Sequence, residues 1–89
     1  MNWNLRFSQQ ADKSLRKLDK SDSSRIIREL EHISTLDNPL TKGTALKGNF
    51  RGLWRYRIGD YRAVCLIKHD KLIILVIDID HRSRVYQNH

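Results

Sequence analysis

The chain has 89 residues, which is enough for one domain, here residues 1–89, and too few for two. Its 17 Lys and Arg outnumber 10 Asp and Glu, so the formal charge is +7. A single cysteine, Cys65, excludes an internal disulfide framework. No apolar signal core opens the sequence, and the longest apolar run, Leu72–Ile77, is far shorter than a membrane span. We therefore expect a basic cytoplasmic domain that binds no membrane and has polyanionic or acidic partners.

Two elements are predicted before residue 20. Trp3, Leu5 and Phe7 alternate with polar residues, which is typical of a short strand. Apolar residues then recur at helical spacing from about Gln9 to Asp19. Ser8 is a suitable N-cap for this helix.

A second helix is predicted after a polar link at Lys20–Asp22, in which Ser21 or Asp22 could cap it. Asp37-Asn38-Pro39 ends it. Because the link is short, the two helices should pack antiparallel. The apolar stripe of this helix contains Ile26, Ile27, Leu30 and Ile33.

The second half of the chain predicts a loop followed by three strands. Residues 40–52 are polar and contain three glycines, which favours a loop. The strands cover Leu53–Ile58, Tyr61–His69 and Leu72–Ile79, separated by tight turns. The last strand is apolar at consecutive positions, so it should be central with both faces covered. The fold class is therefore α+β in the order β-α-α-β-β-β, an antiparallel meander sheet with an N-terminal strand and a helical hairpin packed on one face.

The positive charge is concentrated in the second half of the chain. Residues 1–40 hold seven basic and six acidic residues, a net of +1, whereas residues 41–89 hold ten and four, a net of +6. This asymmetry favours an anion site in the second half, although a solvated surface with a positive bias would give the same count.

Three arginines should share one face of the predicted hairpin. If residues 59–60 form a two-residue turn, Arg57 faces Arg62, and Arg55 lies on the same side by strand alternation. Like charges directly opposite each other are unfavourable, so an anion should compensate them. A phosphate suits the guanidinium fork. The alternative is compensation by the protein's own carboxylates, with Asp78 and Asp80 as candidates.

The C-terminal segment adds further candidates. Arg82 could join the arginine face, and Tyr86 could stack on a base, donate a proton, or simply pack the segment down. His81 has a side chain whose ordinary pKa is near neutrality, so it is either an acid or base or a turn residue. The four histidines lack metal-ligand spacing, so no metal site and no cofactor are predicted.

Three segments form a distinctive set: LKG at 46–48, LWRYRIGDYR at 53–62 and HRSRVY at 81–86. Together with the order of elements, these segments resemble the RelE branch of the RelE/ParE toxin superfamily over nearly the whole chain. The resemblance implies a type II toxin that cuts mRNA in the ribosomal A site and is neutralised by a RelB-like antitoxin. It implies catalytic roles at Arg55, Arg57, Arg62, Arg82 and Tyr86.

One departure concerns the general base. The best-known RelE has lysines where this chain has Arg55 and Arg57, and arginine is a poor base because it stays protonated. Either His81 is the base, or the reaction depends on positioning and charge neutralisation.

The resulting hypothesis is metal-independent RNA cleavage by attack of a 2′-hydroxyl on the adjacent phosphate, with Lys42, Lys47 and Arg51 gripping ribosomal RNA. The alternatives are a ParE-like DNA gyrase inhibitor and a non-catalytic module that binds RNA or the antitoxin. Direct contact with DNA is not expected, except through the antitoxin complex.

Overall fold

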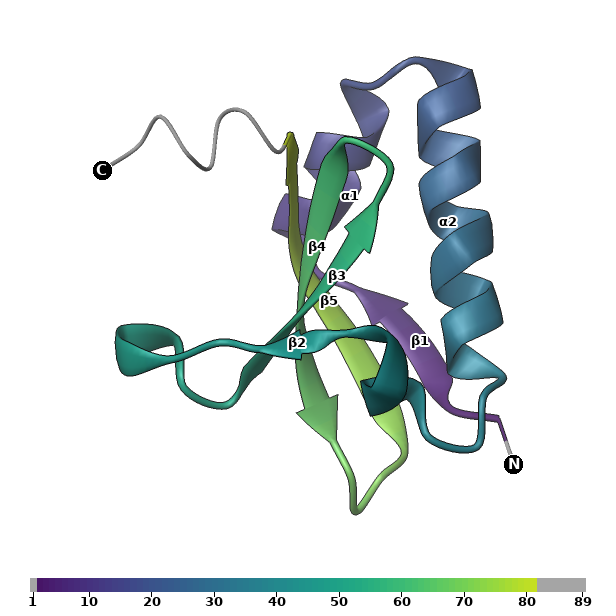
Figure 1. The fold of residues 1–89 in the computed structure, drawn as a ribbon. Helices are drawn as coiled ribbons and strands as arrows, with labels where there is room; N and C mark the ends of the chain where they lie inside the picture. Colours follow the sequence, from purple (N-terminus) through teal and green to yellow (C-terminus); the bar gives the residue numbers. More distant parts are fainter. Residues whose placement is uncertain (1, 82–89) are drawn as a thin grey trace.

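The computed structural model describes residues 2–81, which form a five-stranded sheet with two helices (Figure 1). The strand order is β1-β5-β4-β3-β2. β1 pairs with β5 in parallel, and every other neighbouring pair is antiparallel. The parallel pair was not part of the predicted meander; it forms because the helical hairpin carries the chain away from β1 before the sheet continues. The strands are β1 (Asn4–Phe7), β2 (Thr44–Ala45), β3 (Leu53–Ile58), β4 (Tyr61–Lys68) and β5 (Ile73–His81).

Both predicted helices are present, with different boundaries. α1 covers Gln9–Arg16 and α2 covers Lys20–Ser34. The first helix therefore ends three residues before Asp19, and Asp19 itself, with extended backbone, is the N-cap of α2. The prediction that Ser21 or Asp22 caps α2 is wrong, because residues 17–19 are enough to reverse the direction of the chain between the two helices. The helices run in opposite directions, as predicted (Figure 1).

One face of the sheet packs on both helices and forms the core. Alternate residues of the strands point into it, among them Tyr56 and Ile58 of β3 and Ala63 and Cys65 of β4. Burying this apolar area is the main source of stability in so small a domain. The core contains Ala11, Leu15, Ile26, Leu30 and Ile33 from the helices and Tyr56, Ile58, Ala63, Cys65, Ile74, Val76 and Ile79 from the sheet.

The opposite side of the sheet, here called the helix-free face, is only partly covered. On β5, Ile74 and Val76 are buried, whereas Leu75 and Ile77 are partly exposed. β5 is an interior strand, as predicted, but the expectation that both its faces are fully covered is wrong. The reason is that both helices pack on the same side.

The predicted loop at 40–52 contains more structure than expected. It holds the 3-10 turns η1 (Pro39–Lys42) and η2 (Gly48–Phe50) on either side of the short strand β2. The buried Tyr56 hydroxyl donates to the Pro39 carbonyl at 3.0 Å, and the Trp54 indole nitrogen donates to the Leu40 carbonyl at 3.3 Å. Buried donors need acceptors, so these aromatic residues tie η1 to β3.

A β-bulge at Ile77 reverses the alternation of β5. Cys65 pairs with Val76 but Val64 pairs with Asp78, which leaves Ile77 as the extra residue. Ser8, the N-cap of α1, holds this point: its hydroxyl donates to the Ile77 carbonyl at 2.6 Å. In a regular strand Asp78 would point into the core after Val76; the bulge places Ile79 there instead.

Candidate anion-binding site

The β3–β4 hairpin has the register that the sequence predicted. Ile58 pairs with Tyr61 across a two-residue turn, and Arg57 therefore pairs with Arg62. Gly59 adopts φ +58°, a left-handed conformation that glycine accepts without strain. The Arg25 guanidinium of α2 lies so close that a Cβ on Gly59 would come within 3.0 Å of it. The turn residue and its packing thus both fix the register.

The three arginines of the hairpin lie on the helix-free face. Arg57 is exposed, Arg55 is partly exposed, and Arg62 retains only 7% of its accessible surface. Residues on the same face of neighbouring strands have side chains close enough to interact. The prediction that Arg55, Arg57 and Arg62 share one face of the hairpin is therefore confirmed.

Arg57, Arg62 and Asp80 are paired across three neighbouring strands, so the row that contains two of the arginines also contains a carboxylate. Arg62 pairs with Arg57 on one side and with Asp80 of β5 on the other. In the next row, Val64 separates Arg55 from Asp78, and the Ser14 hydroxyl donates to Asp78 at 3.3 Å. The protein's own acids therefore flank Arg62 in particular, whereas Arg57 lies at the far end of its row.

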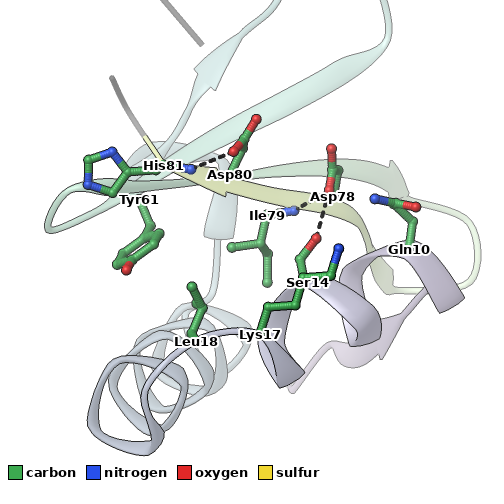
Figure 2. A pocket seen from close by; sticks show the side chains of 9 residues that line it. All are labelled: Gln10, Ser14, Lys17, Leu18, Tyr61, Asp78, Ile79, Asp80 and His81. Carbon is green, nitrogen blue, oxygen red and sulfur yellow. Dashed lines mark hydrogen bonds between the residues drawn. The ribbon is translucent and has the colours of Figure 1, made fainter. Parts of the chain in front are cut away.

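A polar cleft lies between α1 and the C-terminal half of β5 (Figure 2). Asp80 points away from the helices and Ile79 toward them, whereas one carboxylate oxygen of Asp78 accepts the hydrogen bond from Ser14 of α1. The cleft has a volume of about 450 Å³ and is lined by Gln10, Ser14, Lys17, Leu18, Tyr61, Asp78, Ile79, Asp80 and His81.

His81 lies on the helix side of the sheet, away from the arginine row. It pairs with Tyr61, and the two rings meet edge to face with centroids 5.2 Å apart. The Tyr61 hydroxyl donates to Asp22 of α2 at 3.1 Å. Desolvation, followed by the nearby Asp22 carboxylate, raises the pKa of Tyr61. The structure thus brings together Arg55, Arg57 and Arg62 but not His81.

The remaining predicted residues fall into two groups. Lys42, Lys47 and Arg51 are exposed on the segment around β2, as an RNA-gripping role requires. Arg82 and Tyr86 lie outside the described residues. Sequence reasoning did not single out Phe50, although an aromatic residue between glycines and basic residues was a visible signal.

Other chemistry finds little support in the part of the chain that the structure describes. Residues 2–81 contain no group of three or more His, Cys, Asp or Glu that could hold a metal ion. Burial raises the pKa of the Cys65 thiol to about 12, so it stays protonated near neutrality and is unsuited to nucleophilic attack. No helix within the same residues is long and apolar enough to cross a membrane.

Comparison with solved structures shows the same fold in several toxins. The toxin–antitoxin complex RelBE2 from Mycobacterium tuberculosis matches with a TM-score of 0.85 at 24% identity, covering 93% of this chain and 94% of that chain. The archaeal RelE–RelB complex from Pyrococcus horikoshii gives 0.72 at 21%, covering 94% and 99%. A mutant of E. coli RelE bound to an antitoxin RelB peptide gives 0.72 at 25%, covering 98% and 93%.

Sequence comparison identifies the family. No curated protein sequence matches the chain significantly. Residues 5–86 match the family model described as ParE toxin of type II toxin–antitoxin system, parDE. This match spans nearly the whole chain and agrees with the fold. The chain therefore belongs to the RelE/ParE family of type II toxins, with a structure like that of RelE.

Proposed function

We propose that this toxin is a ribosome-dependent endoribonuclease that cuts mRNA in the A site and so inhibits translation. The observation that carries the proposal is the pairing of Arg57 with Arg62, with Arg55 beside them on the helix-free face. Guanidinium groups are always charged and match the geometry of a phosphate. Cations held in place by two adjacent strands suit a phosphodiester whose negative charge grows during cleavage.

In the proposed reaction the 2′-oxygen of one nucleotide attacks its own 3′-phosphorus. The bond to the 5′-oxygen of the next nucleotide breaks, the 2′-hydroxyl loses its proton and the leaving oxygen gains one. The products are a 2′,3′-cyclic phosphate and a 5′-hydroxyl. Arg57 and Arg62 hold the phosphate, Arg82 assists them and Arg55 positions the backbone. Tyr86 stacks on the base or transfers a proton.

The position of His81 favours one of the two explanations for the missing lysine base. His81 pairs with Tyr61 on the helix side, so its ring does not face a phosphate held by Arg57 and Arg62. Arginine stays protonated and cannot take the proton itself. The proposal therefore rests on positioning and charge neutralisation, where each well-placed donor contributes roughly a hundredfold or more in rate.

The proposed partners are the ribosome and an antitoxin. The exposed Lys42, Lys47 and Arg51 would contact ribosomal RNA through counterion release. Because its proposed target is the ribosome, the protein would act in the cytoplasm. Several solved relatives are RelE toxins in complex with RelB antitoxins. A charge of +7 suits an acidic, RelB-like antitoxin that orders on binding. DNA would be reached only through the toxin–antitoxin complex.

A gyrase inhibitor is the second candidate, because the matching family model carries the ParE name. The arginine row distinguishes the two in principle, since phosphodiester cleavage needs it and gyrase binding does not. A module that binds RNA or antitoxin without chemistry would use the same face and leave both substrates intact.

Controlled expression separates the candidates. We expect mapped mRNA ends to show cuts with codon periodicity that disappear in Arg57→Gln and persist in Arg6→Gln. Both residues are exposed on the helix-free face, and each change removes one charge, but Arg6 pairs with Leu75, away from the hairpin. Intact mRNA together with inhibited DNA supercoiling in vitro would show that the protein is a gyrase inhibitor instead. Intact messages and normal supercoiling would leave only the binding module.

A further inference from the structure

Phe50 is the one large apolar side chain with high exposure among residues 2–81. It retains 60% of its accessible surface, whereas every other large apolar residue in this part of the chain is buried or partly buried. A single exposed phenyl ring is unremarkable on a neutral surface. Its surroundings here are unusual and point to a ligand.

The segment that carries Phe50 is an ordered projection. The Leu46 amide donates to the Leu53 carbonyl at 3.0 Å, which closes the segment at its base. Amide hydrogen bonds from Phe50 to Lys47 and from Arg51 to Gly48, at 3.3 and 3.2 Å, form the turn η2. η2 projects sideways from the sheet, away from both helices (Figure 1, left). We call residues 46–53 the η2 projection.

The projection is tied to the strand that carries the arginines. It connects β2 to β3, and Thr44 of β2 pairs with Arg55 of β3. The indole of Trp54 holds η1 through Leu40, so the segment before β2 is fixed as well. The base of the η2 projection is thus fixed against β3, the strand that carries Arg55 and Arg57.

The charge around the ring has one sign. Lys47 and Arg51 flank Phe50, both exposed, and no acidic residue occurs between Asp37 and Asp60. Aromatic rings within a positively charged groove are the usual platform for unpaired nucleobases, because the cations hold the backbone and the ring stacks on the base. We propose that Phe50 stacks on an unpaired base of RNA while Lys47 and Arg51 bind the adjacent phosphates.

A protein partner fits the projection less well. Anchors in protein interfaces lie in apolar surroundings from which water is excluded. The neighbours of Phe50 are Asn49, two charged residues and two glycines, and nothing lies within 4 Å of the Cβ positions of Gly48 and Gly52. The ring therefore stands alone in a cationic, open setting. The inference deepens the proposed function and depends on it only for the choice of RNA.

The test measures binding of a short single-stranded RNA and of the same strand without bases. We expect Phe50→Ala to weaken binding of the complete RNA about tenfold or more, the loss typical of one stacked base. Phe50→Tyr should bind normally, and Phe50→Leu should fail like Phe50→Ala because it is apolar but cannot stack. None of these changes should alter binding of the abasic strand. Equal thermal stability of all variants would show that the fold is intact.

Several outcomes would overturn the inference. Normal binding by Phe50→Leu would show a simple apolar contact, and normal binding by Phe50→Ala would show no contact at all. Equal losses for the complete and abasic strands would assign the effect to charge. A loss of antitoxin binding with unchanged RNA binding would make Phe50 a protein anchor. Because the readout is binding, a chain that proved unable to cleave mRNA would leave this test valid.

Discussion

Replacing Arg57 should stabilise the folded protein while it destroys the proposed activity. Arg57 lies directly opposite Arg62, and like charges in that position are destabilising by roughly 0.2–1 kcal/mol. Asp80, on the other side of Arg62, offsets part of the repulsion. We therefore expect Arg57→Gln to gain about 0.5 kcal/mol, which is roughly 2–4 °C in melting temperature for a domain of this size.

The assay is thermal and urea unfolding of Arg57→Gln and Arg6→Gln at low and high salt. Arg6→Gln lowers the net charge by the same amount on the same sheet face but removes no like-charged pair, since Arg6 faces Leu75. The gain of Arg57→Gln over this control should disappear at about 1 M salt, where the Debye length falls to about 3 Å. If Arg57→Gln were no more stable than Arg6→Gln at low salt, the argument that the row needs an anion would be refuted.

Three further predictions concern the supports of the site. Ser8→Ala should lower the free energy of unfolding in urea by about 1–2 kcal/mol, because it removes both the hydrogen bond to the Ala11 amide and the one to the Ile77 carbonyl. Ser23→Ala is the control and should change the stability little, because the Ser23 hydroxyl is exposed. Gly43→Ala should cost about 1–3 kcal/mol, because the new methyl would overlap the Trp54 ring and lie 2.9 Å from the Arg55 carbonyl; normal stability would contradict the contact. Burial raises the pKa of Cys65 to about 12 from 9.0, so the protonated thiol stabilises the folded state fully below pH 9 and progressively less as the pH rises toward 12. Near pH 10.5 the free energy of unfolding should have fallen by about 2 kcal/mol from this cause. The free energy of unfolding of Cys65→Ala should fall less steeply between pH 9 and 12.

The hairpin was the most predictable part of the molecule because its determinants are local. A two-residue turn with glycine in the left-handed conformation fixes the register of every pair that follows it. The alternation of side chains then assigns Arg55, Arg57 and Arg62 to one face without knowledge of the rest of the fold. The helices were equally visible through their apolar stripes, although their ends depended on a three-residue link that pattern alone does not resolve.

The features that sequence reasoning missed depend on contacts between distant segments. The bulge at Ile77 is held by Ser8, which is far away in the chain, and no local pattern marks it. The strand β2 forms by pairing with β3, and the hydrogen bonds that Trp54 and Tyr56 donate to η1 hold the preceding segment in place. The parallel pairing of β1 with β5 likewise follows from how the helices pack. Each of these features is a consequence of tertiary structure.

The bulge gives the two central arginines different environments. Without it, Asp78 and Asp80 would continue the inward positions of Ile74 and Val76 and would be buried beneath α1, which is costly for a carboxylate. With it, Asp80 lies beside Arg62, which is only 7% exposed, and Arg57 stays exposed at the end of the row. In the proposed reaction, Arg62 would therefore be the fixed cation and Arg57 the one that first contacts the phosphate. A site that holds one cation rigidly and presents a second is well arranged for charge that develops only during the reaction, since the rigid donor needs no reorganisation when that charge appears.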